Sequence, residues 1–173
     1  MKKEKLFWAV LAAAVLIFGL ASHFTGSRQG SLYSQQQILV SDNEGHSFLA
    51  EYEFVQKLPA QQIEARYQRQ VGPAEQKQYT GILLLDFLKA CNMVPQQEQQ
   101  VVVESKDRYN VVLTWEELSA PENVYLVWEE GGKPLTPETG AYQLVIRNDQ
   151  YSTRWVKQVV SVLVDTKTET EVE

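Results

Sequence analysis

The chain has few of the residues from which metal centres and covalent cross-links are made. Its 173 residues include one cysteine, Cys91, and two histidines, His23 and His46. One cysteine excludes a disulfide within the chain and any zinc or iron–sulfur site built from several cysteines. The sequence also has no glycine-rich phosphate loop, no serine-centred nucleophile elbow and no HExxH motif. These absences exclude many common nucleotide-binding, hydrolytic and metal-dependent frameworks.

Positive charge is also scarce. Basic residues number 16 against 22 acidic ones, which gives a net charge of -6. Nucleic acid is therefore excluded as a partner, because clustered positive charge supplies most of the affinity for its phosphate backbone. Beyond Lys5 there remain 13 basic and 21 acidic residues, a net charge of -8. The rest of the chain is not expected to adhere to an anionic membrane surface through charge.

Residues 1–24 have the pattern of a targeting segment. Three lysines among the first five residues precede an apolar run from Leu6 to Phe24. That run is long enough to cross a hydrocarbon layer of about 30 Å, which predicts a retained single-pass membrane helix. The alternative is a signal peptide cleaved after the small-x-small sequence Gly19–Ala21. In both cases the C-terminal domain is extracytoplasmic, anchored in the cell membrane if the segment is retained and secreted if it is cleaved.

Composition divides the remainder into three parts. Residues 25–37 are rich in glycine, serine and glutamine and are interpreted as a polar spacer. Residues 38–164 contain nearly all the strand-like and helix-like patterns and are predicted to form one domain. Residues 165–173 are acidic with interleaved threonines and have no apolar face, so this tail is expected to be frayed.

Hydrophobic periodicity predicts an α+β domain with a mixed sheet and short helices. A helix is predicted from Gly81 to Cys91 with Thr80 as its N-cap. Thr114 and Glu117 have the spacing of a capping box, which predicts a short helix from Trp115. The segment 48–58 fits a strand and a helix equally well. Strands are predicted over Ile38–Val40, Ile63–Tyr67, Val101–Val103, Tyr109–Leu113, Val124–Trp128, Tyr142–Ile146 and Trp155–Val164.

Few side chains carry a chemical signal of their own. The adjacent carboxylates of Glu116 and Glu117, like those of Glu129 and Glu130, do not face each other on a helix or strand. They are therefore interpreted as solvated surface. Cys91 lies on the apolar side of its predicted helix and is expected to be a buried, unreactive thiol. His46, in a polar turn, is expected to be exposed.

The aromatic and cationic residues leave more than one interpretation open. Trp115, Trp128 and Trp155 could line a ligand-binding surface, although aromatic residues that alternate along strands are more typical of a core. Arg154 and Lys157 flank Trp155 and could grip an anion. On a strand they would lie on opposite faces, whereas a turn near Ser152 would bring them together. The alternative is that both are surface charges that keep a valine-rich strand soluble.

Five motifs, read in order, resemble the molybdopterin-binding domain of the sulfite oxidase family. None is specific alone, but their order and spacing together are, and the resemblance covers roughly 38–164. The motifs are YTGILLLDFLKA at 79–90, VVVESKDRY at 101–109, GKPL at 132–135, GAYQLVI at 140–146 and YSTRWVK at 151–157.

The resemblance implies a mixed α+β fold that holds an oxo-molybdenum cofactor through its pterin and phosphate. It also implies oxygen-atom transfer to or from sulfite, sulfoxides or similar small oxyanions. If an anion or pterin phosphate is bound, Arg154 and Lys157 are predicted to attract it, with Asp107 and Tyr109 lining the same cleft. The family's metal-bound thiolate falls within Ile63–Gly72, where this sequence has no cysteine.

Other positions also depart from the family pattern. Arg108 replaces the glycine of the family's D-G-Y, and Tyr142 replaces the proline of its G-G-P. Without a protein thiolate, a molybdenum centre loses a soft ligand that sets its electronic properties. The sequence therefore predicts a membrane-anchored, extracytoplasmic molybdopterin-binding-like domain without standard molybdenum catalysis. The alternatives are an active molybdopterin-dependent oxidoreductase and a ligand-free protein-interaction module with an unknown protein partner.

Overall fold

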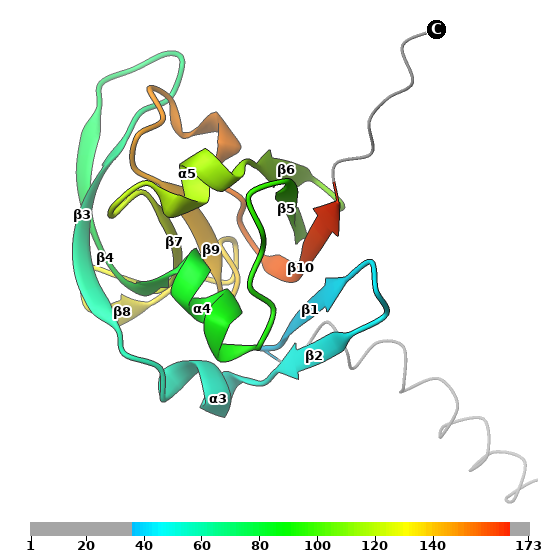
Figure 1. Cartoon of the computed structure of the whole chain (residues 1–173). Helices are drawn as coiled ribbons and strands as arrows, with labels where there is room; N and C mark the ends of the chain where they lie inside the picture. The colour runs from blue at the N-terminus through cyan, green and yellow to red at the C-terminus, as the bar shows by residue number, and fades with distance from the viewer. Residues whose placement is uncertain (1–35, 167–173) are drawn as a thin grey trace, which may run out of the picture. The chain divides into compact units, whose positions relative to one another are not determined.

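The computed structural model describes residues 36–166. The predicted membrane segment and most of the spacer and tail therefore lie outside the described residues. Within 36–166 no helix is long and apolar enough to cross a membrane. The described residues form two sheets with short helices between and around them (Figure 1), as the predicted α+β class requires.

The first sheet has five strands in the order β2-β1-β10-β5-β6. The hydrogen-bonded neighbours are antiparallel except β1 and β10, which run parallel although they are separated by more than 100 residues. Valines dominate its inner face, where they alternate with outward-facing residues, as expected for a half-buried sheet. The strands are β1 (Ile38–Asp42), β2 (Ser47–Ala50), β5 (Gln99–Ser105), β6 (Asn110–Leu113) and β10 (Val159–Thr166).

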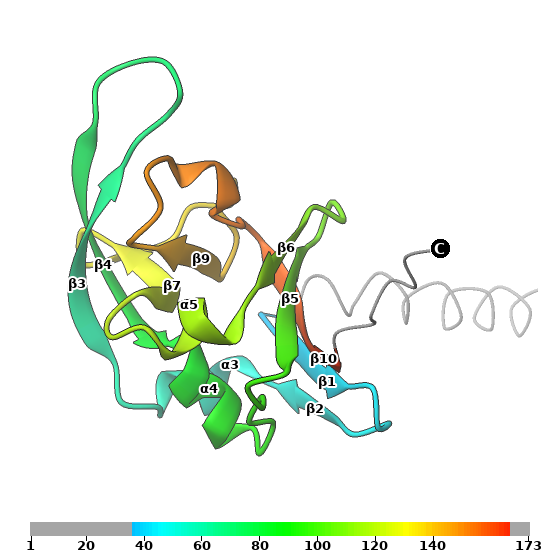
Figure 2. The same ribbon diagram turned by 45° about the horizontal axis from the view of Figure 1, so that its top comes forward.

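The second sheet has the order β3-β4-β7-β8, with β9 also paired to β7. Its central strand is buried on both faces from Val124 to Trp128. Figure 2 shows the β3–β4 hairpin extending beyond the rest of the domain. The strands are β3 (Gln61–Tyr67), β4 (Glu75–Leu83), β7 (Val124–Glu130), β8 (Lys133–Pro134) and β9 (Gln143–Ile146).

Three short α-helices and one 3-10 turn complete the domain. Helix α4 (Leu84–Ala90) packs against β4 and β7, and α5 (Trp115–Ser119) packs against α4 and β5. Together the two helices link the second sheet, through α4, to the first sheet, through α5, and their buried leucines join one continuous core. Helix α3 (Tyr52–Gln56) connects the first sheet to β3, and η1 (Ser152–Arg154) leads towards β10.

Several expected elements are confirmed. The β5–β6 hairpin turns through 105–109, and β3 alternates between exposed and buried residues. The Thr114–Glu117 capping box is formed in full at the start of α5. The ambiguous segment 48–58 is both a strand and a helix, because β2 ends at Ala50 and α3 begins at Tyr52.

The predicted start of the Gly81–Cys91 helix is wrong. Residues up to Leu83 belong to β4, so Thr80 is not an N-cap and α4 begins at Leu84. The backbone from Tyr79 to Leu83 pairs with β7, and these tertiary hydrogen bonds override the local helix signal. The strand predicted to begin at Trp155 begins later, because β10 starts at Val159. Strand β10 also includes Asp165, the first residue of the predicted tail.

Gly81 allows β4 to approach β7 closely at an irregularity in their register. A Cβ atom at this position would lie 2.4 Å from the Leu126 carbonyl oxygen and 2.8 Å from the Val127 Cα. Both contacts are with backbone in the middle of a buried strand, so the clash cannot be relieved by a side-chain rotation. The glycine of the Tyr79-Thr80-Gly81 motif is therefore required by packing.

We expect Gly81→Ala to lower the free energy of unfolding by about 1–3 kcal/mol, the usual cost of overpacking a close contact. Urea denaturation of the two proteins measures the difference. Gln76→Ala, an exposed position on the same strand, is the matched control and should change stability by no more than about 0.5 kcal/mol. Equal stability of Gly81→Ala and the parent would show that the strands can separate at this point without cost.

Candidate functional site

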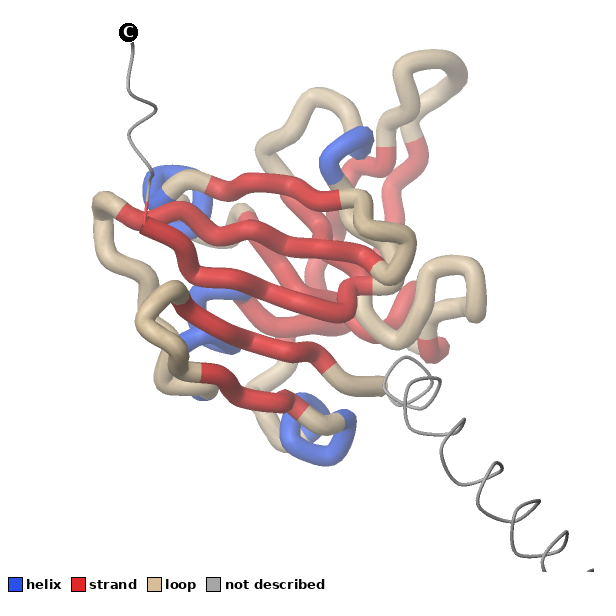
Figure 3. The backbone as a smooth tube through the Cα atoms, turned by 90° about the vertical axis from the view of Figure 1, so that its right-hand side faces the viewer, coloured by secondary structure: helices blue, strands red, loops and turns tan. Residues whose placement is uncertain are grey.

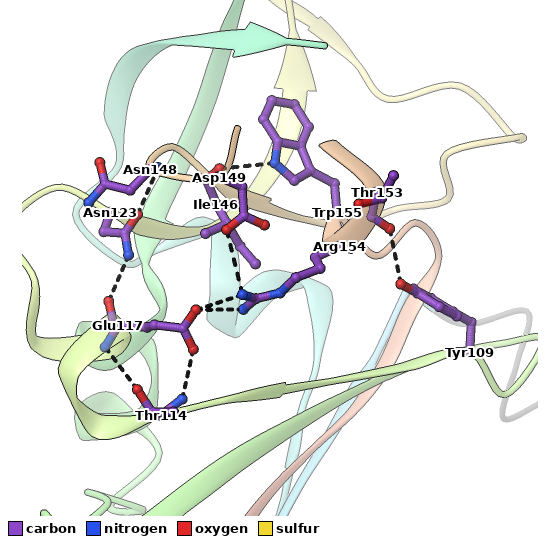
Figure 4. A network of polar contacts seen from close by, with 10 residues as sticks. All are labelled: Tyr109, Thr114, Glu117, Asn123, Ile146, Asn148, Asp149, Thr153, Arg154 and Trp155. Atoms are coloured by element: carbon purple, nitrogen blue, oxygen red, sulfur yellow. Dashed lines mark hydrogen bonds and ion pairs between the residues drawn. The ribbon is translucent and has the colours of Figure 1, made fainter. Parts of the chain in front are cut away.

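Arg154, the cation of the Tyr151–Lys157 motif, is engaged by carboxylates of its own chain. Both of its terminal nitrogens donate to Glu117 Oε1 at 2.7 Å, and Nη1 lies 3.6 Å from Asp149 Oδ1 (Figure 4). Its side chain is 36% exposed. Two carboxylates facing one guanidinium leave no excess positive charge at this position. Arg154 is therefore a poor anchor for an external anion.

Glu117 connects this arginine to the start of α5. Its Oε2 accepts the Thr114 backbone N–H at 3.0 Å, and its own backbone N–H donates to the Thr114 hydroxyl at 3.3 Å. The Asn123 side chain donates to the Glu117 carbonyl and accepts the Asn148 backbone N–H (Figure 4). The expectation of a solvated surface carboxylate is wrong for Glu117, whose side chain is only 26% exposed.

Trp155 is a core residue. Its indole nitrogen donates to the Ile146 carbonyl at 3.0 Å, and its ring contacts those of Tyr67 and Tyr79. Trp155 and Tyr79 are almost fully buried, as is Trp128, while Trp115 is half-buried. The core interpretation of the aromatic residues is therefore confirmed for two of the three tryptophans, and the ligand-surface alternative loses Trp155 as a free platform.

The structure brings three of the four predicted site residues together. Asp107, Tyr109 and Lys157 line an open depression of about 270 Å³, which Arg154 does not line. The Tyr109 hydroxyl donates to the Thr153 carbonyl at 3.0 Å and so ties the β5–β6 turn to η1 (Figure 4). The remaining lining residues are Ser105, Glu138, Trp155 and Gln158.

The charges around this depression do not favour an anion. The Ser105 hydroxyl and the Tyr109 backbone N–H lower the pKa of Asp107. The Thr136 hydroxyl is the main cause that lowers the pKa of Glu138, and Lys157 contributes. Both carboxylates are therefore ionised at neutral pH, and among the lining residues only Lys157 opposes them. Among the lining residues alone, a phosphate entering here would meet two carboxylates and one ammonium.

The chain from Ile63 to Gly72, where the resemblance places the family's metal-bound thiolate, is most of β3 and the turn that follows it. The Gln68 carbonyl accepts both the backbone N–H and the hydroxyl of Ser152, each at 2.8 Å. The Gln68 side-chain amide donates to the carbonyls of Arg69 and Gly72. Protein hydrogen bonds thus fill this position, and it offers neither a thiol nor an imidazole.

Cys91 does not substitute for the missing ligand. It follows α4, is 3% exposed, and burial raises the pKa of its thiol to about 12. A thiol must lose its proton to bind a metal or act as a nucleophile, so Cys91 is an inert core residue. The sequence expectation of a buried thiol is confirmed.

The one grouping of possible metal ligands in the described part of the chain is Asp42, Glu44 and His46. It lies in the exposed β1–β2 turn, where Asp42 Oδ1 accepts the backbone N–H groups of Glu44 and His46. His46 Nδ1 lies 2.8 Å from Asp42 Oδ2. This turn is at the opposite end of the first sheet from Asp107. The contacts are those of a side-chain-stabilised turn, and His46 is exposed as expected.

The comparisons with known proteins decide the family. The oxidoreductase molybdopterin binding domain family matches residues 52–172. This chain belongs to that family. Among curated proteins no match is found. Among solved structures the domain resembles the sulfane dehydrogenase SoxCD from Paracoccus pantotrophus, with a TM-score of 0.65 and 16% identity over 76% of this chain. The aligned part is 38% of that SoxCD chain, and at this identity the likeness concerns the fold alone.

The residues of this family member do not fit a thiolate-held molybdenum. The turn after β3 has no soft ligand, Cys91 is buried and protonated, and Arg154 is neutralised by Glu117. The replacement of the family's glycine by Arg108 is also visible, because Arg108 has a φ of 69° in the β5–β6 turn. This left-handed conformation, which glycine adopts without penalty, costs a non-glycine residue about 1 kcal/mol.

Sequence reasoning missed three carboxylates that shape the site. Glu117 had a signal, since its capping-box spacing with Thr114 indicated a structural role. Nothing in the sequence pointed to Asp149 or Glu138, because their roles arise from contacts between segments brought together by the fold. The predicted roles of Asp107, Tyr109, Arg154 and Lys157 in holding a cofactor stay a prediction.

We expect Cys91→Ala to fold and to lower the free energy of unfolding by about 1 kcal/mol, as for removal of one small buried group. Chemical denaturation measures this change. In the folded parent protein, a thiol reagent should label Cys91 only on the timescale of unfolding. Labelling as fast as that of an unfolded control would place the thiol at the surface instead.

Asp149 is expected to destabilise the fold at neutral pH. Its Oδ2 is buried without a hydrogen-bond partner among the described residues, and burial raises the pKa of its carboxyl despite Arg154. A raised pKa means that the ionised form is disfavoured in the folded state, so the penalty is present above the raised pKa and vanishes below the ordinary value near 3.8.

Asp149→Asn should therefore raise the free energy of unfolding at pH 7, and the advantage should disappear as the pH falls below about 4. Denaturation of both proteins across this pH range tests the sign. Asp86→Asn, an acidic position on α4 with an ordinary exposed ion pair to Lys89, serves as the control. A loss of stability in Asp149→Asn at pH 7 would mean that attraction to Arg154 outweighs burial.

Proposed function

We propose that this chain is a membrane-anchored, extracytoplasmic member of the molybdopterin-binding family that acts without the family's molybdenum catalysis. The observation that carries the proposal is the turn after β3. There the carbonyl of Gln68 is bound by Ser152 and its side chain closes the turn on Arg69 and Gly72. A position occupied by internal hydrogen bonds has no ligand to offer a metal.

The surrounding side chains support the same conclusion. Tyr67, at the end of β3, contacts Trp155 and lies beneath the cations of Arg69 and Lys77, at 5.5 and 4.8 Å from its ring centre. Lys77 in turn pairs with Glu130 at 2.7 Å. These contacts hold the region between β3 and η1 in a packed arrangement, where an exposed cofactor site would need open, unpaired donors.

The location of the protein at the membrane rests on the sequence of the first 24 residues. Three lysines followed by an apolar run from Leu6 to Phe24 favour a retained anchor with the domain outside the cytoplasm. The 13 residues of the polar spacer allow the domain to stand clear of the bilayer. A secreted protein is the alternative if the segment is cleaved.

Two other functions remain as alternatives. An active oxidoreductase acting on a small oxyanion or sulfoxide would require molybdenum bound without a cysteine or through a substitute ligand. A ligand-free interaction module would have its former ligand pocket filled by packed core, whereas the depression at Asp107, Tyr109 and Lys157 is open. The excess of negative charge in that depression favours the interaction module over a pterin phosphate or another small anion as ligand.

Elemental analysis of the full chain purified from a host that makes molybdopterin tests the proposal. We expect molybdenum far below one atom per chain, because the protein supplies no soft ligand. A thiolate-bearing member of the same family, purified in parallel, controls for cofactor supply. Near-stoichiometric molybdenum in this chain would overturn the proposal and favour the oxidoreductase. N-terminal sequencing of the same sample should find the intact segment, whereas a sequence starting near Ser22 would show cleavage.

A further inference from the structure

The outer face of the first sheet is uncovered in the described part of the chain. The core lies behind its inner face, and Figure 3 shows that no described helix crosses in front of the five strands. Two of these strands, β1 and β2, precede the residues matched by the family. The sheet is thus wider than the matched part of the chain alone would make it.

An apolar stripe crosses this face from edge to edge. Leu39 pairs with Leu49, while Leu163, Val102 and Val112 form a row across β10, β5 and β6. Leu39, Leu49 and Val112 are 45%, 42% and 45% exposed, although a leucine or valine gains free energy when it is buried. Every strand of the sheet contributes one of these residues, and the stripe shifts by two residues between β1 and β10, because Leu39 lies opposite Ser161 rather than Leu163.

The two turns at the corners of this face carry opposite charge. The β5–β6 turn contains Lys106 and Arg108, and the β1–β2 turn contains Asp42 and Glu44. Because β1 is parallel and β5 antiparallel to β10, these turns lie at opposite strand ends. They also lie towards opposite edges of the sheet. They therefore occupy diagonally opposite corners.

The charges are only partly compensated within each turn. In the basic turn, the Asp107 carboxylate accepts hydrogen bonds from Ser105 and Tyr109 rather than from Lys106 or Arg108. In the acidic turn, His46 contacts Asp42 at 2.8 Å but lies 3.9 Å from Glu44, whose side chain is 78% exposed. The basic turn thus has two cations against the one carboxylate of Asp107, with Glu104 of β5 beside it, and the acidic turn has Asp42 and Glu44 against His46.

We propose that this face binds the same face of a second copy of the chain. A two-fold axis lying in the interface along the other diagonal exchanges the two charged corners. Rotation about this axis places the basic turn of each copy over the acidic turn of the other. The strands of the two copies then cross at nearly a right angle, which is one of the two preferred arrangements of packed sheets. The apolar stripes meet around the axis, close to Leu163 on the central strand.

The size of the face predicts a weak pair. Five strands spaced about 4.8 Å apart and about five residues long give an area of roughly 400 Å² for each copy. The total of about 800 Å² is below the 1,200 Å² typical of stable complexes, so pairing depends on local concentration. A lipid surface is a poorer occupant, because anionic headgroups would be repelled by the acidic corner.

Cross-linking of the full-length protein tests this arrangement. Leu163→Cys and Ser161→Cys place a thiol on the central strand near the axis, and the buried Cys91 does not compete for reagent. A short bis-maleimide is expected to convert both variants to covalent dimers. Val71→Cys, at an 87% exposed position in the β3–β4 turn, is the matched control and should stay monomeric.

Charge reversal tests the pairing of the charged turns without changing the apolar stripe. Lys106→Glu with Arg108→Glu, introduced together with Leu163→Cys, should lower dimer formation about tenfold, because like charges then face each other. Adding Glu44→Lys to the same chain should recover part of the cross-linking, since the new positive charge offsets Asp42 and removes the like-charge repulsion at both corners. Recovery of this kind excludes misfolding as the cause of the loss.

Three results would overturn the proposal. The first is equal cross-linking of Val71→Cys, which would show non-specific encounter. The second is a Leu163→Cys thiol that is protected from reagent in a monomer, which would mean that another part of the chain covers the face. The third is protection of the Leu163→Cys thiol from reagent when the protein is placed in lipid vesicles, with no covalent dimer, which would mean that lipid covers the face. None of these outcomes depends on whether molybdenum is bound.

Discussion

The ion pair between Arg154 and Glu117 is the contact on which the rest of the site depends. It joins η1 to the start of α5, where the other Glu117 oxygen accepts the Thr114 backbone N–H. Trp155 follows directly in the chain and is placed in the core by the same turn. The positive charge of Arg154 therefore stabilises the contact between η1 and α5.

Much of the fold was predictable because local patterns and tertiary contacts agree. The alternation in β3, the β5–β6 hairpin and the Thr114–Glu117 box all reflect interactions within a few residues. The boundary between β4 and α4 was not predictable, because the apolar run from Ile82 to Leu85 suits a strand and a helix equally. Pairing with β7, more than 40 residues away, fixes that boundary.

The candidate site was predictable only as a set of residues. The resemblance placed Asp107, Tyr109 and Lys157 near one another, and the fold does so. It placed Arg154 beside them, whereas the structure turns its guanidinium towards Glu117 and Asp149. A sequence reports which side chains are present, but the partner of each charge depends on which distant segments meet, and burial then sets which groups keep their protons.

The parallel pairing of β1 with β10 has a consequence for how the domain is made. The first strand of the described domain pairs with the last. The backbone of Leu39 therefore lacks its hydrogen bonds on that side until the segment around Ser161 is in place. The chain is synthesised from its N-terminus, so β1 is made long before β10. Pairing between such distant segments is slow because a long loop must close first. The first sheet therefore cannot be completed until the residues of β10 have been synthesised. Until then the free edge of the β1–β2 hairpin has unpaired backbone groups, which can pair with other chains.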